Sequence, residues 1–459
     1  MLLVTAAQHS PVRRSGRIIA NFNVIVNRSQ DSPGRVLTLA VQVDDKAALI
    51  EPPVETSEAS ARWWHRFADI YETESAPSRI VPMEGVRGWA VLLVFFVHFH
   101  GAFSKYASPG SPLFHISEFL GTLGATGVDL FFVISGYLIY GAVIRSRFNY
   151  RRFMWRRVQR IYPTFLFIFF IYIGLWLFSS DENFKLHGTI GQKAAYIAQN
   201  LLFMPGIFRV RAMIVVAWSL SYEMFFYLVL PLVVAVTGMR RSSRAFRVSV
   251  FLALIAVGIL ISPLWVHPRV RLIGFLFGIV LFEVEEGFRA RSSNFSNLLV
   301  LGAYLCGLGL IFALDTTSVI PDSFVLPVTS AIAGVTSFAL CGFCFHGGGI
   351  LSRALSWRPL RALGNMSYSY YLIHGLAIGA VRQVVRRLLQ PGDHNLAFLG
   401  MLLAALAVSW IASTLLFIAI ERPFSIDVGR KTLVARGRSQ LVALALPDAL
   451  QQRLRKAVF

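Results

Sequence analysis

Two ionisable residues lie in the first long apolar segment of the chain. Arg87 and His98 are eleven positions apart, which on a helix puts them about 20° from one shared face and about 16 Å apart along the axis. If Arg87 stands at one membrane surface, His98 lies near the middle of a hydrocarbon layer of about 30 Å. An arginine at such an entrance suits an anionic ligand. A neutral imidazole can act as a general base for a hydroxyl, or carry an acyl group itself. The competing interpretation of His98 is a buried structural histidine.

The second apolar segment adds an acid and a pair of small residues. We expect Asp129, near the outer end of this segment, to hold His98 in one tautomer or to accept a proton from a substrate hydroxyl. The alternative is an interfacial acid exposed to water. Ser135 and Gly136 allow a helix or a ligand to approach closely, and packing is the favoured interpretation of the two.

Charged residues in the third and fourth segments extend this set. Arg157 and Arg160 are three positions apart and share a helical face, which suits phosphate binding as well as simple membrane topology. Glu223 interrupts an apolar run, where an acid rarely lacks a partner. We expect a role in the site for Glu223, with a salt bridge to Arg87 or Arg157 as the alternative.

Three further residues are expected at the substrate: Ser135, Trp218 and His374. His374 follows three tyrosines on one segment, so structural hydrogen bonding competes with substrate binding there. Glu421, followed by Arg and Pro, is typical of a helix end at a membrane surface.

Composition decides what kind of chain must position these residues. Of 459 residues, 55% are hydrophobic and 15% are charged, and the mean hydropathy is +0.60. About 25% is charged in an ordinary soluble domain, which excludes a soluble globular enzyme and a disordered scaffold. The net charge of +20 would suggest nucleic acid in a soluble protein. Here the basic residues lie mainly between apolar segments and no aromatic-basic motif is visible, so a nucleic-acid partner is not expected. The three cysteines have no metal-binding spacing, so a metal is not expected either.

The apolar pattern predicts an all-α integral membrane protein with about ten transmembrane helices. They cover 88–104, 118–144, 161–179, 213–237, 249–262, 272–284, 297–314, 325–347, 367–381 and 396–420. The fifth, sixth and ninth are short for a span, so we expect them to extend into their flanks. Most of the 44 Lys and Arg residues fall in the two tails and the loops on their side, which places both termini in the cytoplasm. The main exceptions are the arginines at 382, 386 and 387.

The two ends of the chain differ from its middle. Residues 1–78 form an N-terminal extension of unknown role, expected in the cytoplasm, with two alternating stretches typical of short strands. A small folded appendage, a disordered tail and sequence upstream of the true start are the alternatives. Residues 426–459 form a basic cytoplasmic tail that suits the inner leaflet.

Six motifs, taken in order, resemble the bacterial membrane acyltransferase-3 family, the O-acetyltransferases of cell-surface polysaccharides. They are Glu84-Gly-Val-Arg-Gly with His98, Gly127-Val-Asp-Leu-Phe-Phe-Val-Ile-Ser-Gly, Arg157-x-x-Arg160-Ile-Tyr-Pro, Trp218-Ser-Leu-x-x-Glu223 with Phe226-Tyr227, Ser367-Tyr-Ser-x-Tyr-Leu-x-His374, and Glu421-Arg-Pro. The resemblance covers residues 79–425. Glu84 departs from the aspartate usual in the family and keeps its charge.

The resemblance implies a membrane-bound O-acyltransferase in the bacterial inner membrane. It implies acyl-CoA, most simply acetyl-CoA, as donor from the cytoplasm, and a hydroxyl of a glycan or lipid-linked glycan as acceptor. Arg87 and His98 match the family's Arg-x10-His motif, and Arg157 and Arg160 match its paired-arginine motif. We therefore expect His98, Asp129 and Glu223 to be catalytic and Arg87, Arg157 and Arg160 to bind the donor. The alternative function is export of a glycan precursor. The identity of the acceptor stays open, and so does the choice between acetyl and another short acyl group. The sequence also leaves open whether transfer passes through a covalent acyl-histidine or occurs directly.

Overall fold

The computed structural model describes residues 22–27, 38–43, 70–71, 80–145, 148–178, 188–262, 268–291, 293–346 and 349–426. The chain divides into two units, Met1–Trp64 and His65–Phe459, and each is described by itself. The first contains one antiparallel hairpin, in which β1 (Phe22–Asn27) pairs with β2 (Thr38–Val43). Phe22 lies opposite Val43 and Asn27 opposite Thr38, which confirms the strands expected from the alternating pattern. Apart from this hairpin and two residues at 70–71, the N-terminal extension lies outside the described residues, as does the tail from 427.

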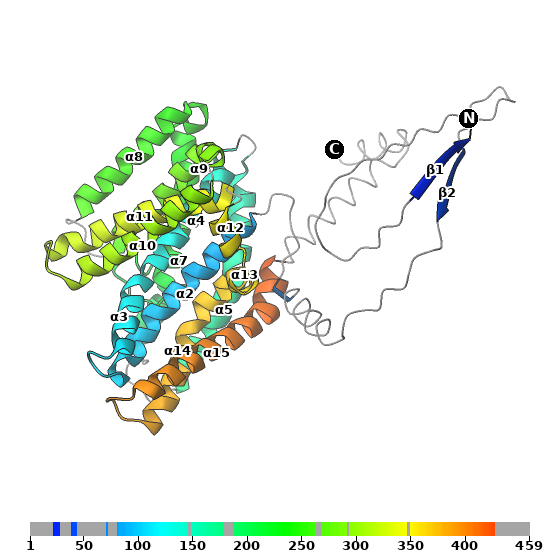
Figure 1. Ribbon diagram of the computed structural model, residues 1–459. Helices are drawn as coiled ribbons and strands as arrows, with labels where there is room; N and C mark the ends of the chain where they lie inside the picture. Colours follow the sequence, from blue (N-terminus) through cyan, green and yellow to red (C-terminus); the bar gives the residue numbers. More distant parts are fainter. Residues whose placement is uncertain are drawn as a thin grey trace, which may run out of the picture. The chain divides into compact units, whose positions relative to one another are not determined.

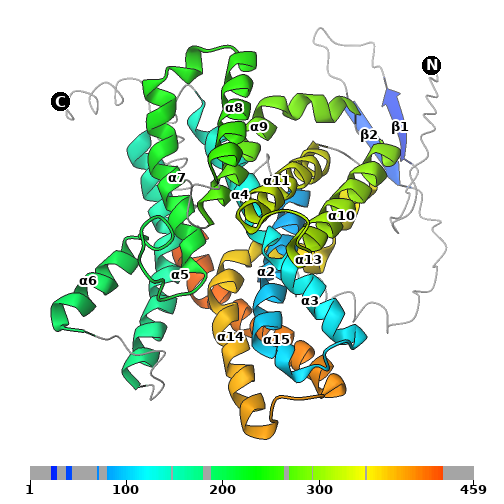
Figure 2. The ribbon, with the colours of Figure 1, turned by 90° about the vertical axis from the view of Figure 1, so that its left-hand side faces the viewer.

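The second unit is a bundle of helices (Figures 1 and 2). Its longer helices are α2 (Val81–Phe103), α3 (Pro112–Gly124), α4 (Thr126–Val143), α5 (Tyr150–Phe178), α6 (Ile190–Leu201), α7 (Ala217–Val236), α8 (Arg244–Ile261), α9 (Ile273–Arg291), α10 (Asn294–Thr316), α11 (Asp322–His346), α14 (Ser367–Leu388) and α15 (Asn395–Leu416). Short helices α12 (Ile350–Leu355) and α13 (Arg358–Asn365) precede α14, and a π-helical stretch, Phe417–Ile426, continues α15.

Helices cover most of each of the ten predicted segments, as far as the structure describes them. Within the described residues, eight helices or continuous helix pairs are long and apolar enough to cross a membrane, and α9 and α14 are not among them. Both of these helices carry several charged residues in their C-terminal halves. Helices α8, α9 and α14 extend beyond the predicted segments, as expected from their short apolar runs. The fold is that of an all-α integral membrane protein, and the count of ten and the side of the termini stay predictions.

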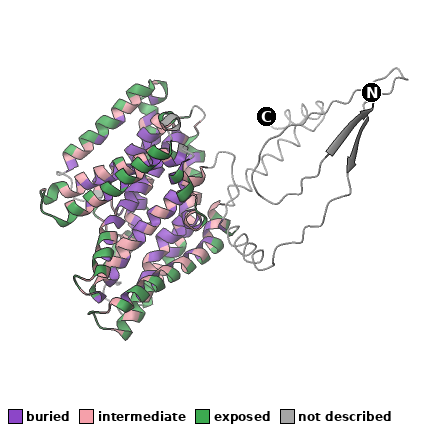
Figure 3. Cartoon of the chain, in the orientation of Figure 1, coloured by how far each residue is buried: buried purple, intermediate pink, exposed green. Residues whose placement is uncertain are grey.

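Burial is arranged as lipid requires (Figure 3). Buried residues gather where helices meet, while large apolar side chains such as Phe170 and Leu260 are 63% and 77% exposed on the outside. Such a surface is unfavourable in water and suits a hydrocarbon solvent. Helix α8 lies at the edge of the bundle and buries only Phe251 and Ile255.

Glycines allow α2 to cross the short helices very closely. A Cβ atom on Gly85 would lie 1.6 Å from the carbonyl oxygen of Leu355, and one on Gly88 would lie 2.0 Å from that of Leu360. These glycines flank Arg87, so the crossing fixes where this arginine lies. Helices α4 and α9 cross in the same way, since a Cβ atom on Gly136 would lie 2.1 Å from the carbonyl oxygen of Phe275. Of the two small residues Ser135 and Gly136, the packing interpretation is therefore confirmed for Gly136.

Candidate active site

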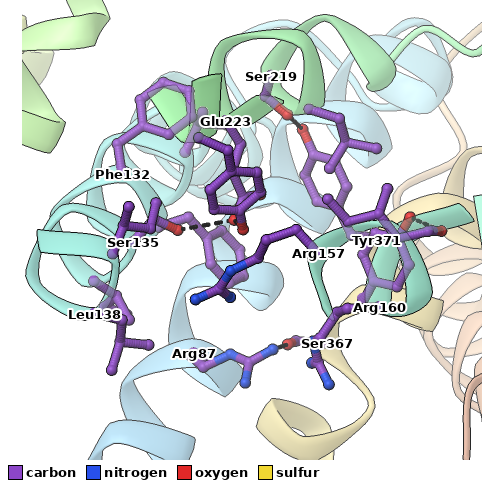
Figure 4. A pocket seen from close by; sticks show the side chains of 18 residues that line it. Arg87, Phe132, Ser135, Leu138, Arg157, Arg160, Ser219, Glu223, Ser367 and Tyr371 are labelled. Atoms are coloured by element: carbon purple, nitrogen blue, oxygen red, sulfur yellow. Dashed lines mark hydrogen bonds between the residues drawn. The ribbon is translucent and has the colours of Figure 1, made fainter. Parts of the chain in front are cut away.

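A cavity of about 330 Å³ opens between α2, α4, α5, α7 and α14 (Figure 4). Arg87, Arg157 and Arg160 line it together, although they come from two different helices. Glu223 and Ser135 line it from α7 and α4. The structure thus brings together five of the residues selected from the sequence. Three guanidinium groups against one carboxylate make this lining favourable for an anion.

Each arginine is held by a different contact. Arg87 donates to the hydroxyl oxygen of Ser367 at 2.8 Å, across from α2 to α14. The guanidinium carbon of Arg157 lies 4.9 Å from the ring centre of Tyr227, a cation–π contact that orients its plane. Arg160 lies 3.6 Å from the carboxylate of Glu421, whose side chain is fully buried. Glu421 therefore does more than end a helix, because it fixes a cation of the cavity.

Glu223 is held by hydroxyl groups. Its carboxylate accepts a hydrogen bond from Ser135 at 3.3 Å and another from Tyr227, one turn along α7. No ion pair joins it to Arg87 or Arg157 among the contacts of the described residues, so the salt-bridge alternative is wrong. Its carboxylate therefore faces the cavity, held by two hydroxyl donors, and the three arginines line the same cavity.

His98 lies beside this cavity and is not among the residues that line it. Its Nδ1 atom is 2.8 Å from the carbonyl oxygen of Val94 and 3.3 Å from Nε2 of His374. Because a carbonyl oxygen only accepts, Nδ1 of His98 carries the proton and Nε2 carries the lone pair. No hydrogen bond within the described part of the chain occupies this Nε2 atom, and the side chain is half-buried. These are the features required of a base or nucleophile.

Tyr371 and His374 connect the cavity to His98. Tyr371 lines the cavity, and its ring centre lies 6.0 Å from that of His374. The ring of His374 in turn lies 4.8 Å from that of His98. His374 is fully buried and faces His98, so direct contact with a substrate, which we expected from the sequence, does not fit its place. Trp218 is not a lining residue either, whereas its neighbour Ser219 lines the cavity and hydrogen-bonds to Tyr371 at 2.6 Å.

Asp129 lies in a different place from the one expected. It forms an ion pair with Arg271 and borders a second cavity of about 250 Å³, together with Asp315 and Asp322. It has no hydrogen bond to His98, which corrects the expectation that Asp129 fixes the histidine tautomer. The helical face of α4 that carries Asp129 is turned to the segment containing Arg271, and spacing along the chain gave no sign of this.

Several residues of the cavity escaped selection from the sequence. Ser367 and Tyr371 stand in the motif that ends with His374, where the histidine drew attention because it titrates. Tyr227 stands one helical turn after Glu223, a spacing that on a helix places two side chains in contact. No group of three or more His, Cys, Asp or Glu residues able to hold a metal is found in the residues that the structure describes.

The helices and the cavity define a multi-pass membrane protein with a site suited to an anionic ligand, and comparison with known proteins identifies its class as a membrane O-acyltransferase. Residues 81–414 match the acyltransferase domain family, and the chain belongs to it. It is 29% identical over 385 residues to acyltransferase MdmB of Streptomyces mycarofaciens, covering 78% of this chain and 94% of that protein.

Two further relatives are longer proteins. O-acetyltransferase OatA of Staphylococcus aureus is 26% identical over 324 residues, which cover 65% of this chain and 50% of OatA. The putative peptidoglycan O-acetyltransferase YrhL of Bacillus subtilis is 26% identical over 323 residues, which cover 64% of this chain and 48% of YrhL. The chain thus matches about half the length of OatA and YrhL. No solved structure matches it.

Proposed function

We propose that this enzyme transfers an acetyl group from cytoplasmic acyl-CoA to a hydroxyl of an exported glycan, in the bacterial inner membrane. The names of OatA and YrhL support O-acetylation, and that of YrhL supports a glycan acceptor. The observation that carries the donor assignment is the meeting of Arg87, Arg157 and Arg160 in one cavity. Coenzyme A carries phosphates at one end and a thioester at the other, so these cations bind the phosphates while the acyl end extends toward His98.

In the proposed reaction His98 acts through Nε2. This atom takes the proton of the acceptor hydroxyl as its oxygen attacks the thioester carbonyl carbon. The bond from carbon to sulfur then breaks, and the CoA thiolate leaves and takes the proton held on Nε2, which returns His98 to its neutral form. Transfer through an acyl group on Nε2 uses the same lone pair in two successive displacements. Glu223 supplies the carboxylate of the cavity. Its proposed role is to contact a hydroxyl group of the acceptor.

Purified enzyme with His98→Ala tests the assignment. Radiolabelled acetyl-CoA and an extract of cell-envelope glycans give two readouts, CoA release and label in the glycan. Loss of the general base lowers transfer by about 10²- to 10⁴-fold, with normal membrane insertion. His115→Ala is the matched control, because His115 is an exposed histidine. Undiminished transfer by the His98 variant would show that this residue takes no part in the reaction. In a separate transport assay, flux of a glycan precursor without CoA would favour an exporter.

A further inference from the structure

Two imidazole rings meet inside the bundle, and the proposed reaction uses only one of them. His98 on α2 and His374 on α14 lie with their ring centres 4.8 Å apart and their planes at 79°. They are 276 positions apart in the sequence, so their meeting is a product of the fold. His374 is fully buried, which denies it direct contact with a substrate and leaves open what its polar ring does.

The backbone determines where the protons of this pair lie. Nδ1 of His98 faces the carbonyl oxygen of Val94 at 2.8 Å, and Nδ1 of His374 faces that of Tyr370 at 3.0 Å. Each Nδ1 is therefore a donor, and each Nε2 carries a lone pair. The lone pair of His374 faces Nδ1 of His98 at 3.3 Å. One N–H group of His98 is thus shared between two acceptors, a carbonyl oxygen and a second imidazole.

The surroundings of His374 hold its ring in this orientation. The ring of Tyr370 is stacked nearly parallel to it at 6.0 Å, and the ring of Tyr371 lies at the same distance on a tilted plane. Tyr371 is itself anchored, since its hydroxyl donates to the carbonyl oxygen of Val216 at 3.1 Å. An acceptor fixed by packing orients a reacting histidine better than a mobile one.

We propose that His374 is a positioning residue, which orients the ring of His98 as a second acceptor for its Nδ1–H group and accepts a stronger hydrogen bond when His98 becomes charged during transfer. This inference rests on the proposed function. The arrangement gives His374 part of the task that a buried carboxylate performs in a Ser-His-Asp triad, where the acceptor orients the histidine and stabilises the imidazolium. A neutral acceptor performs it here without bringing a charge into the middle of the membrane.

Two substitutions of His374 distinguish a hydrogen-bond acceptor from a side chain that only fills space. His374→Leu removes the acceptor and keeps an apolar side chain, so kcat should fall about ten- to a hundredfold while KM for acetyl-CoA stays within about twofold. His374→Gln places an amide oxygen near the former Nε2 atom and should recover most of the loss. If Gln and Leu are equally impaired with normal unfolding midpoints, packing explains the residue and the proposal is overturned.

A spectroscopic measurement decides the same point without turnover. In enzyme carrying ¹⁵N-labelled histidine, the two ring nitrogens of His98 should show protonated Nδ1 and unprotonated Nε2, in the wild type and in the Gln variant. The Leu variant should keep this tautomer, because the carbonyl oxygen of Val94 still accepts from Nδ1, and its Nδ1 proton should move upfield because one of its two acceptors is lost. A wild-type His98 protonated on Nε2 overturns the proposal even if no variant folds. If His98→Ala keeps full activity, the proposed function fails, whereas full activity of His374→Leu beside an inactive His98→Ala refutes this inference alone.

Discussion

Replacing Gly88 by alanine tests whether the crossing of α2 and α13 positions Arg87. The added Cβ atom would lie 2.0 Å from the carbonyl oxygen of Leu360, against about 3.3 Å for a close C···O contact. The helices must therefore separate by about 1.3 Å. Ser367 begins α14 directly after α13, so the same movement lengthens its 2.8 Å hydrogen bond with Arg87 to about 4 Å, beyond hydrogen-bonding distance. We expect an overpacking cost of about 1–3 kcal/mol and weaker donor binding.

Gly101→Ala is the matched control for this substitution. Gly101 lies on the same helix, and a Cβ atom there would meet nothing within 4 Å. Alanine in place of an exposed helical glycine stabilises by up to about 1 kcal/mol, so the two variants should differ by about 1–4 kcal/mol. Thermal unfolding in detergent, followed by circular dichroism, measures stability, and calorimetric titration with CoA measures donor binding. Equal unfolding midpoints for the two variants would refute this account of the crossing.

Three further substitutions test individual contacts. Arg157→Lys keeps the charge and loses the planar cation–π contact, so KM for acetyl-CoA should rise by the equivalent of about 0.5–2 kcal/mol, and an unchanged KM would remove Arg157 from the donor site. Arg247→Met removes the arginine closest to the carboxylate of Glu283, which is 3% exposed. Breaking a buried ion pair should cost about 3 kcal/mol of stability, seen as a lower unfolding midpoint. Asp129→Asn removes the carboxylate paired with Arg271, so the same measurement should show destabilisation, and an unaltered midpoint would mean that this pair contributes nothing.

The helices could be predicted from the sequence because lipid imposes a strong pattern. A chain with 15% charged residues must keep them out of its spans, so apolar runs mark the helices closely. The arginine cavity could also be anticipated, since Arg157 and Arg160 share a face of α5 whatever the rest of the bundle does. Predictions of this kind depend on one helix at a time.

What could not be predicted depends on which faces of different helices meet. Asp129 was expected beside His98 and His374 was expected at the substrate, and only the packing of α4 and α14 shows that His374 is the neighbour of His98. The extension of α9 and α14 was expected, but where each helix ends was not, because charged residues continue the helix beyond the apolar run. Glu421 was interpreted as a helix stop because its partner, Arg160, lies more than 250 positions earlier in the chain.

The contacts of Glu421 have a consequence for biosynthesis. Its carboxylate accepts hydrogen bonds from the backbone and hydroxyl of Ser369 and lies beside Arg160, so α5, α14 and the π-helical stretch after α15 are joined at one point. A nascent chain that has inserted only its first helices already contains every arginine of the cavity, yet lacks the acid that holds one of them. The ribosome must therefore deliver the segment that carries Glu421 before the arginine cavity has all of its contacts.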